Sequence, residues 1–239
     1  QSVYPIVAAM STEAIHLPLA EGSGGMIAAG AAKALRDGTR RYTNILVGCG
    51  LGLSDGTVEL VEDLLFNQES SDFSGFTNLP ALVDADGLNN LARIDRWWER
   101  ERGPMVLTPH PGEMATLTGL ATADIQQDRV GVAREYAVRW GVCLVLKGAN
   151  TIISQPDGAV RIAALANPGM SSGGTGDVLS GVIAGLMAQG LPPIAAATCG
   201  VYLHGEAGMD VVARQGDTGL AASDLLPQIP VTLRRLREG

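Results

Sequence analysis

Residues 167–183 read Asn167-Pro168-Gly169-Met170-Ser171-Ser172-Gly173-Gly174-Thr175-Gly176-Asp177 and continue into the apolar run Val178-Leu179-Ser180-Gly181-Val182-Ile183. A glycine-rich loop that feeds a helix directs several unpaired backbone N–H groups at one point, and the helix dipole adds about 0.3–1 kcal/mol of favourable potential for an anion. Glycines suit such a loop because side chains obstruct a close ligand and some positions need a positive φ. The segment therefore predicts a phosphate site at Gly173, Gly174, Thr175 and Gly176.

Asp177 closes this loop and has two interpretations. A carboxylate among phosphate-binding amides repels an anionic ligand, so its presence there suggests a chemical role. Removal of a proton from a substrate is one such role. The other interpretation is a helix cap. The loop alone favours neither, and it lacks both the Gly-Lys-Ser/Thr of a Walker A motif and the GxGxxG fingerprint that follows a strand in dinucleotide-binding folds.

Short apolar runs recur along the chain with the length and branching of buried strands. They lie at Ile45–Val47, Ala81–Val83, residues 106–107 and Cys143–Leu146, and each ends in Gly, Asp, Thr or Lys. Segments of helical period lie between them, as in Ala133, Tyr136, Ala137 and Trp140, with Asp124 as the expected N-cap. This alternation predicts an α/β fold with a mostly parallel central sheet, helices on both faces, and ligands beyond the carboxyl ends of the strands.

Two further patterns complete the expected fold. Residues 151–154 and 160–163 flank the turn sequence Gln-Pro-Asp-Gly and predict an antiparallel hairpin. The last third of the chain predicts three helices, at residues 177–189, 193–214 and 223–237.

The segment Thr108-Pro109-His110-Pro111-Gly112-Glu113 follows an apolar run. Two prolines fix the backbone on either side of His110, so the imidazole is presented at a strand end with little freedom, which suits ligand contact. The alternative is a turn in which His110 only satisfies a backbone group. Glu113 is equally explained as a favourable charge in the first turn of a helix.

Lys147-Gly148-Ala149-Asn150-Thr151 follows the buried run Cys143–Leu146. An ammonium at a strand end meets phosphate as a point charge, while Asn150 and Thr151 offer hydrogen bonds to ribose or phosphate oxygens. This segment is either half of a nucleotide site or a solvated strand end.

Glycines and acids also follow two earlier strands. Gly48-Cys49-Gly50-Leu51-Gly52 comes after the first, and Asp84-Ala85-Asp86-Gly87-Leu88-Asn89 after the second. Asp84 and Asp86 are candidates for organising Mg²⁺ through water or for binding hydroxyls, although acids at strand ends are also common turn and cap formers. No protein metal ligand is predicted on this basis.

Composition restricts the class of protein. Hydrophobic residues make up 46% of the chain and charged residues 18%, which suits a globular domain with a sizeable core. With a net charge of −8 and a pI near 4.8 there is no overall basic character, so nucleic acid is not an expected partner. The three cysteines fit no disulfide or zinc pattern, and no apolar run is long enough to span a bilayer, so we expect a cytoplasmic protein without membrane insertion.

Five segments in this order and spacing resemble the ADP- or ATP-dependent NAD(P)H-hydrate dehydratases, a branch of the ribokinase-like superfamily. They are GLG at residues 50–52, DADGLN at 84–89, TPHPGE at 108–113, KGANT at 147–151 and NPGMSSGGTGDVLSG at 167–181. The resemblance covers nearly the whole chain. TPHPGE and the late motif are highly specific for that family, whereas GLG and KGANT are weak singly.

The resemblance implies a ribokinase-like fold and an enzyme that restores NADH or NADPH from the hydrates (6S)-NADHX and NADPHX. A nucleotide, ADP before ATP, phosphorylates the hydroxyl of the hydrated ring and phosphate is then eliminated, with Mg²⁺ accompanying the nucleotide. Asp177 is implied to be the base. Gly52, His110 and Asp177 are implied to contact the hydrate, and the nucleotide is implied to contact Lys147, Gly148, Ala149, Asn150, Thr151 and Gly176. A homotetramer is also implied.

One departure from the family bears on these expectations. Members usually begin with a further strand, Gly-Ser loop and helix ahead of the region that matches residues 1–13. A segment of about 30 or more residues is therefore expected to be missing, which predicts that residues 1–239 form a single, N-terminally incomplete domain without the epimerase domain often fused to it. The alternatives are a ribokinase-like kinase of a small alcohol such as a vitamin precursor, and an inactive nucleotide-binding fragment.

Overall fold

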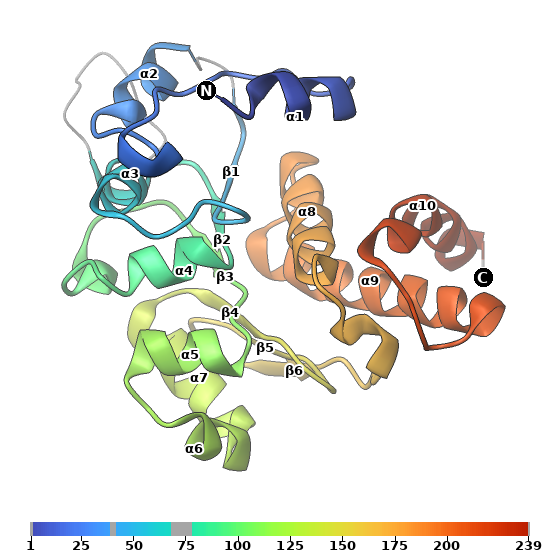
Figure 1. The fold of residues 1–239 in the computed structure, drawn as a ribbon. Coiled ribbons are helices and arrows are strands. Elements are labelled where there is room, and N and C mark those ends of the chain that lie inside the picture. The colour runs from blue at the N-terminus through green and yellow to red at the C-terminus, as the bar shows by residue number, and fades with distance from the viewer. Residues whose placement is uncertain (1, 39–41, 68–77, 239) are drawn as a thin grey trace.

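The computed structural model describes residues 2–38, 42–67 and 78–238, and the strands in these ranges form one six-stranded sheet (Figure 1). Neighbouring strands follow chain order. The first four are parallel to one another, and the last two continue the sheet in antiparallel pairing. The strands are β1 (Ile45–Val47), β2 (Ala81–Val83), β3 (Met105–Leu107), β4 (Cys143–Leu146), β5 (Ile152–Ser154) and β6 (Val160–Ile162).

These strands confirm the predicted α/β class with a mostly parallel sheet. β1, β2 and β4 have the expected bounds, and β3 begins one residue earlier than expected. The predicted hairpin forms as β5 and β6. Thr151 is outside β5 because it belongs to the preceding turn, where its hydroxyl donates to the carbonyl of Gly148 at 2.9 Å.

Helices cover both faces of the sheet, as predicted. Side chains of successive strand residues point to opposite faces, so Val83 and Leu107 face one apolar cluster while Leu82 and Val106 face another. The first cluster includes side chains of α3 (Asp55–Phe66), α4 (Asp86–Leu91), α5 (Pro111–Thr118), α6 (Thr122–Gln127) and α7 (Arg129–Trp140), and the second those of α8 (Thr175–Ala188) and α9 (Pro193–Gln215).

The remaining helices lie farther from the sheet. The C-terminal α10 (Ala222–Glu238) lies against α9 and α8, around an apolar cluster of Val211, Leu220 and Leu225. Near the N-terminus, α1 (Tyr4–Met10) has no buried residue and α2 (Ala31–Gly38) lies beside α3 (Figure 1). No helix in the described ranges combines the length and apolar character needed to cross a lipid bilayer.

The helix bounds differ from the sequence prediction at one cap. Ala133, Tyr136, Ala137 and Trp140 are all buried on one face of α7, as their spacing predicts. The cap of that helix is Asp128, whose side chain accepts from the amide of Gly131 at 2.8 Å. Asp124 lies in the first turn of α6, so its assignment as this cap was wrong. The three C-terminal helices agree with prediction to within two residues at each end.

Backbone contact between the loops after β1 and β2 requires two glycines. Gly48 has φ +134°, and a Cβ at this position would lie 1.8 Å from the carbonyl oxygen of Asp84. A Cβ on Gly87 would lie 2.6 Å from the carbonyl oxygen of Val47. These contacts bring the Cys49–Gly52 loop directly against Asp84 and Asp86.

We predict that Gly48→Ala destabilises the fold by about 3 kcal/mol or more, because the new methyl group meets rigid backbone and the φ angle disfavours any side chain. Urea unfolding followed by circular dichroism measures the change. The matched control is Gly185→Ala in α8, where a Cβ meets nothing within 4 Å and a helical alanine gains up to about 1 kcal/mol. Equal stabilities of the two variants would contradict this account.

Candidate active site

The loop before α8 presents open backbone amides, as the sequence predicts. Gly174 is the N-cap of α8 with φ +86°, and its helix carries no side-chain cap. The amides of Gly173, Gly174, Gly176 and Asp177 make no hydrogen bond within the described ranges. The loop is closed instead by the Thr175 hydroxyl, which lies 2.7 Å from the carbonyl of Met170. We call residues 173–177 the amide nest.

Asp177 is not the cap of α8, so that alternative is wrong. It is the third residue of the helix and is exposed. Its carboxylate, the Asp84 carboxylate and the Cys49 thiol approach within 4.8 Å of one another. The Cys49 thiol donates a hydrogen bond to Asp177, and Asp177 has no cationic partner among the described residues.

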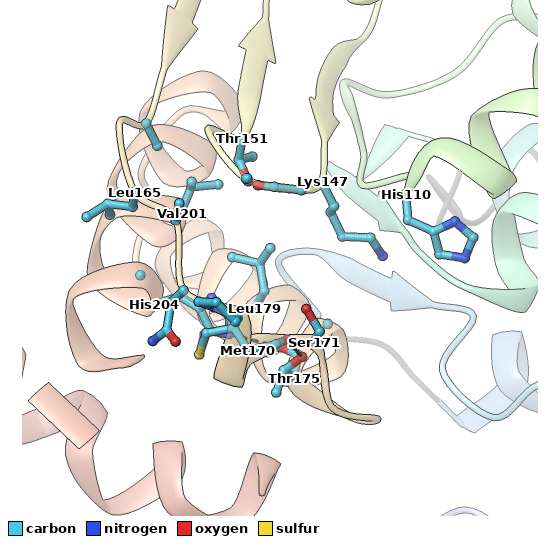
Figure 2. Close-up of a pocket in the computed structure, with 18 of the residues that line it drawn as sticks. His110, Lys147, Thr151, Leu165, Met170, Ser171, Thr175, Leu179, Val201 and His204 are labelled. Atoms are coloured by element: carbon cyan, nitrogen blue, oxygen red, sulfur yellow. Dashed lines mark hydrogen bonds between the residues drawn. The ribbon is translucent and has the colours of Figure 1, made fainter. Parts of the chain in front are cut away.

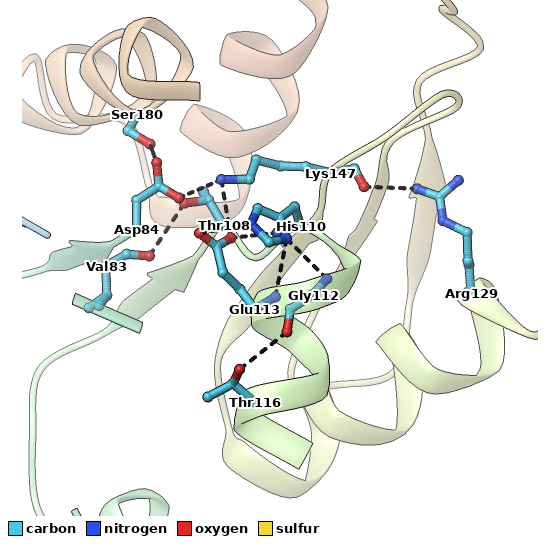
Figure 3. Close-up of polar contacts among 10 residues, drawn as sticks. All are labelled: Val83, Asp84, Thr108, His110, Gly112, Glu113, Thr116, Arg129, Lys147 and Ser180. Atoms are coloured by element: carbon cyan, nitrogen blue, oxygen red, sulfur yellow. Dashed lines mark hydrogen bonds and ion pairs between the residues drawn. The ribbon is translucent and has the colours of Figure 1, made fainter. Parts of the chain in front are cut away.

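Lys147 lies at the centre of a buried polar network (Figure 3). Its Nζ donates to Asp84 Oδ1 at 2.6 Å and lies 3.5 Å from Glu113 Oε2. The other oxygen of Asp84 accepts from the Ser180 hydroxyl at 2.7 Å. A Cβ on Gly176 would lie 3.5 Å from Lys147 Nζ, so the ammonium borders the amide nest.

The Lys147–Thr151 turn depends on a residue that motif analysis missed. Arg129 donates from Nη1 to the carbonyl of Ala149 at 2.6 Å and from Nη2 to those of Leu146 and Lys147 at 3.2 Å. Burial lowers the pKa of this guanidinium. Within the turn Asn150 has φ +55° and its amide donates to the carbonyl of Leu165 at 2.9 Å. The turn is therefore fixed before any ligand binds.

His110 both caps a helix and borders the cavity described below. Its Nδ1 accepts from the amides of Gly112 and Glu113 at 3.0 and 3.1 Å, which places the ring proton on Nε2. Glu113 Oε2 accepts from the His110 amide at 2.7 Å. His110 thus satisfies backbone groups, as one sequence interpretation expects, while its contact with a ligand stays a prediction. Glu113 is a partner of Lys147 as well as a first-turn charge.

Two residues of α4, Asp86 and Asn90, hold Gly52 in place. Its amide donates to Asp86 Oδ2 at 2.9 Å, and its carbonyl accepts from Asn90 Nδ2 at 2.9 Å. Asn90 is fully buried and was not identified from the sequence. Both Asp84 oxygens and one Asp86 oxygen accept from protein donors, so these two acids hold Lys147, Ser180 and Gly52 in place.

A cavity of about 530 Å³ lies between the Lys147 turn, the amide nest and α9 (Figure 2). It is bordered by several residues predicted for the nucleotide, together with His110, and these are Lys147, Gly148, Ala149, Thr151, Thr175 and Gly176. Asn150, Gly173 and Gly174 are outside its lining, as are Gly52 and Asp177. Gly176 thus borders the cavity, and the next residue, Asp177, does not.

The far wall of this cavity was not predicted. It includes Leu165, Leu179, Val201 and His204. Leu179 lies within the motif at residues 167–181, whereas Leu165, Val201 and His204 lie outside all the quoted motifs. Burial lowers the pKa of His204 from 6.5 to about 4, so its ring is neutral near pH 7.

A protein family and several known proteins are similar to this chain. The family model described as NAD(P)H-hydrate dehydratase matches residues 6–231. The chain belongs to the NAD(P)H-hydrate dehydratase family. The resemblance inferred from the motifs is therefore confirmed, and solved structures of ribokinase-like proteins confirm the expected fold.

Three family relatives illustrate the similarity. A bifunctional NAD(P)H-hydrate repair enzyme from Moorella thermoacetica is 43% identical over 100% of this chain and 43% of its own length. An ADP-dependent (S)-NAD(P)H-hydrate dehydratase from Xanthomonas campestris is 31% identical over 100% of this chain and 77% of its own. The Bacillus subtilis ADP/ATP-dependent dehydratase, co-crystallised with ATP/Mg²⁺, has a TM-score of 0.79 at 27% identity over 98% of this chain and 78% of its own. This chain thus spans less than half of the bifunctional relative.

We predict that Cys49 resists alkylation at pH 8. Burial, the hydrogen bond to Asp177 and the Asp177 charge raise the pKa of this thiol to about 12, leaving a thiolate fraction of about 10⁻⁴. Asp177→Ala removes the bond and the charge and should accelerate labelling of Cys49 by iodoacetamide, measured by peptide mass spectrometry. The exposed Cys199 is the internal control, with an unchanged rate in both proteins. An unaltered Cys49 rate in the variant would exclude the contact.

We also predict that His204 makes stability depend on pH. Because its pKa is about 4 when folded and near 6.5 when unfolded, its contribution is complete above pH 6.5 and is lost as the pH falls towards 4. The loss amounts to about 3 kcal/mol. His204→Gln should flatten the pH dependence of urea-unfolding stability over this range, whereas Tyr202→Gln, at an exposed position of the same helix, should keep the wild-type slope. A parallel profile for wild type and His204→Gln would contradict the assignment.

Proposed function

We propose that this chain catalyses the ADP-dependent dehydration of (6S)-NADHX and NADPHX to NADH and NADPH. One observation supports this most: near the first turn of α8, open amides lie beside the Lys147 ammonium, and the Asp177 carboxylate has no cationic partner in the described ranges. Amides and ammonium suit a phosphoryl group, and the carboxylate suits deprotonation of an alcohol. The family and its ADP-dependent relatives point to the same reaction.

The nucleotide is proposed to bind in the 530 Å³ cavity with its phosphates at the amide nest. The cavity borders both the Lys147 turn and the helix N-terminus, which are two separate anion-binding elements. The proposed contacts remain those expected from the sequence: Lys147, Gly148, Ala149, Asn150, Thr151, Gly173, Gly174, Thr175 and Gly176. For the three outside the lining, the backbone conformation of their turn or loop is the contribution we propose.

The hydrate is proposed to bind beside Asp177, in contact with Gly52 and His110. Asp177 lies near Cys49, and Cys49 belongs to the same loop as Gly52. His110 presents Nε2–H near Glu113, at 3.4 Å from its Oε1. The transferred phosphoryl group then lies between the two substrates, at the first turn of α8.

The proposed chemistry has two stages. Asp177 removes the proton of the ring hydroxyl as the hydroxyl oxygen attacks the terminal phosphorus of ADP, and AMP leaves. The new bond joins that oxygen to phosphorus. The original bond between the ring carbon and this oxygen then breaks, phosphate departs with the oxygen, and loss of a proton from the adjacent ring carbon restores the carbon–carbon double bond. The amide nest stabilises the charge that develops on the phosphoryl oxygens.

Mg²⁺ is proposed to enter with the nucleotide. Asp177 is a nearby carboxylate without a cationic partner in the described ranges, and the Cys49 thiol is a poor ligand for this hard cation. The described side chains therefore fit an ion held mainly by phosphate oxygens and water, which supplies charge neutralisation during transfer.

The cellular setting is also part of this proposal. All three cysteines are free, which supports a reducing cytoplasm. We propose a homotetramer on the family resemblance, and a single ribokinase-like domain over residues 1–239.

The decisive experiment mixes purified protein with NADHX and Mg²⁺ and follows the absorbance of the reduced nicotinamide with ADP, with ATP and without nucleotide. Regeneration with ADP supports the proposal. A phosphorylated product that accumulates without NADH would favour a kinase, and no nucleotide-dependent change would exclude the dehydratase.

Asp177→Ala is expected to reduce this turnover by at least about 10³-fold, since the base is lost, while ADP binding measured by calorimetry changes less than about threefold. Asp95→Ala is the matched control, because that carboxylate is exposed and lies beyond α4. Wild-type turnover in Asp177→Ala would refute the proposed role.

A further inference from the structure

His204 occupies a distinctive place in the proposed nucleotide cavity. It lies on α9, is 9% exposed, and borders the cavity together with Leu165, Leu179 and Val201 (Figure 2). These neighbours are apolar and suit the faces of a planar base. A nitrogen-bearing ring in such a wall is able to distinguish one base from another.

The position of the ring proton follows from one contact. His204 Nε2 lies 2.9 Å from the backbone carbonyl oxygen of Thr175. A carbonyl oxygen only accepts, so Nε2 must carry the proton. The neutral ring then has an unprotonated Nδ1, which is a hydrogen-bond acceptor.

Nδ1 has no protein donor among the described residues, and it remains accessible to solvent. Buried side-chain atoms without a partner are found in the described ranges at Arg129, Ser154 and Asn167, and Nδ1 of His204 is not one of them. Since His204 is buried from the outside and borders the cavity, the accessible side of Nδ1 faces the cavity.

We infer that His204 is a specificity-determining residue that accepts a hydrogen bond at Nδ1 from the 6-amino group of an adenine base. This inference rests on the proposed function, because it takes the cavity as the nucleotide site. Adenine presents an N–H donor at position 6, whereas hypoxanthine and guanine present a carbonyl oxygen there. A carbonyl placed against Nδ1 sets two acceptors against each other.

The contact between His204 and α8 places the two ends of the proposed nucleotide site in one cavity. The same His204 ring bonds to the carbonyl oxygen of Thr175, which is the first residue of α8 and part of the amide nest. A base at His204 and phosphates at the nest therefore occupy one continuous cavity that also includes the Lys147 turn.

The first experiment measures the base preference of the wild-type protein by calorimetry with Mg²⁺ present. The ligands are ADP, purine riboside diphosphate, which lacks the 6-amino group, and inosine diphosphate. We expect about 10-fold weaker binding of the purine riboside diphosphate and a larger loss for inosine diphosphate. Equal affinities for ADP and purine riboside diphosphate would overturn the inference without affecting the proposed reaction.

The second experiment uses His204→Gln. The glutamine amide nitrogen is able to replace Nε2–H as a donor to Thr175. The amide oxygen is also an acceptor, but it is three bonds from Cβ whereas Nδ1 is two bonds from Cβ, so it does not lie at the place of Nδ1. We expect the three affinities to converge to within about twofold, with binding of tripolyphosphate unchanged. Tyr202→Gln is the matched control on the same helix, because Tyr202 is 47% exposed and outside the cavity lining; it should keep the wild-type preference.

The outcomes separate the two proposals. If His204→Gln retains the wild-type preference for ADP, the inference is wrong even when NADHX turnover is normal. If the wild-type protein binds none of the three nucleotides, the proposed function fails together with the inference. Should His204→Gln not fold, the wild-type comparison of ADP with purine riboside diphosphate still decides.

Discussion

The buried ion pair between Asp84 and Lys147 connects the parts of the candidate site. Asp84 is 1% exposed, and its two oxygens bind Lys147 from the end of β4 and Ser180 from α8. A buried charge that loses its partner is strongly destabilising, so these groups stay together. The ends of β2 and β4 are thereby fixed to the first turns of α8, and Glu113 adds α5 through its contact with Lys147. The positions of the amide nest and of the two substrates in the proposed reaction depend on this arrangement.

Much of the fold was predictable because its strands are buried on both faces. β2, β3 and β4 consist entirely of buried residues, so each reads as a continuous apolar run rather than as an alternating one. Helix starts were harder to predict. Asp124 and Asp128 both lie at or near helix starts, and only the non-helical backbone of Asp128, at φ −137°, separates α6 from α7. Local sequence alone does not show which of two nearby acids ends one helix and caps the next.

The sequence predicted the parts of the candidate site that consecutive residues form, and it did not predict the parts that depend on long-range contacts. The amide nest and the Lys147 turn were found because their geometry follows from consecutive residues. Ser180, Asn90, Arg129 and His204 were missed because their roles arise from contacts across the chain. Ser180 meets Asp84 over 96 positions, and His204 meets Thr175 over 29. An arginine or a histidine within a helix has no local pattern that reveals such a partner, and conformation alone excluded Asp177 as a cap.

The charges of the site determine what a nucleotide has to bring with it. Asp84 and Glu113 contact one ammonium, that of Lys147, and a third carboxylate, Asp177, lies near Asp84. The net charge of the chain is −8. A polyphosphate entering alone meets more negative charge than positive, so backbone amides and the dipole of α8 must supply most of the attraction. A divalent cation bound to the phosphates neutralises the remaining excess of negative charge. Because Lys147 is engaged by Asp84 and Glu113, Asp177 keeps no cationic partner in the described part of the chain, and an unneutralised carboxylate is what proton removal from an alcohol requires.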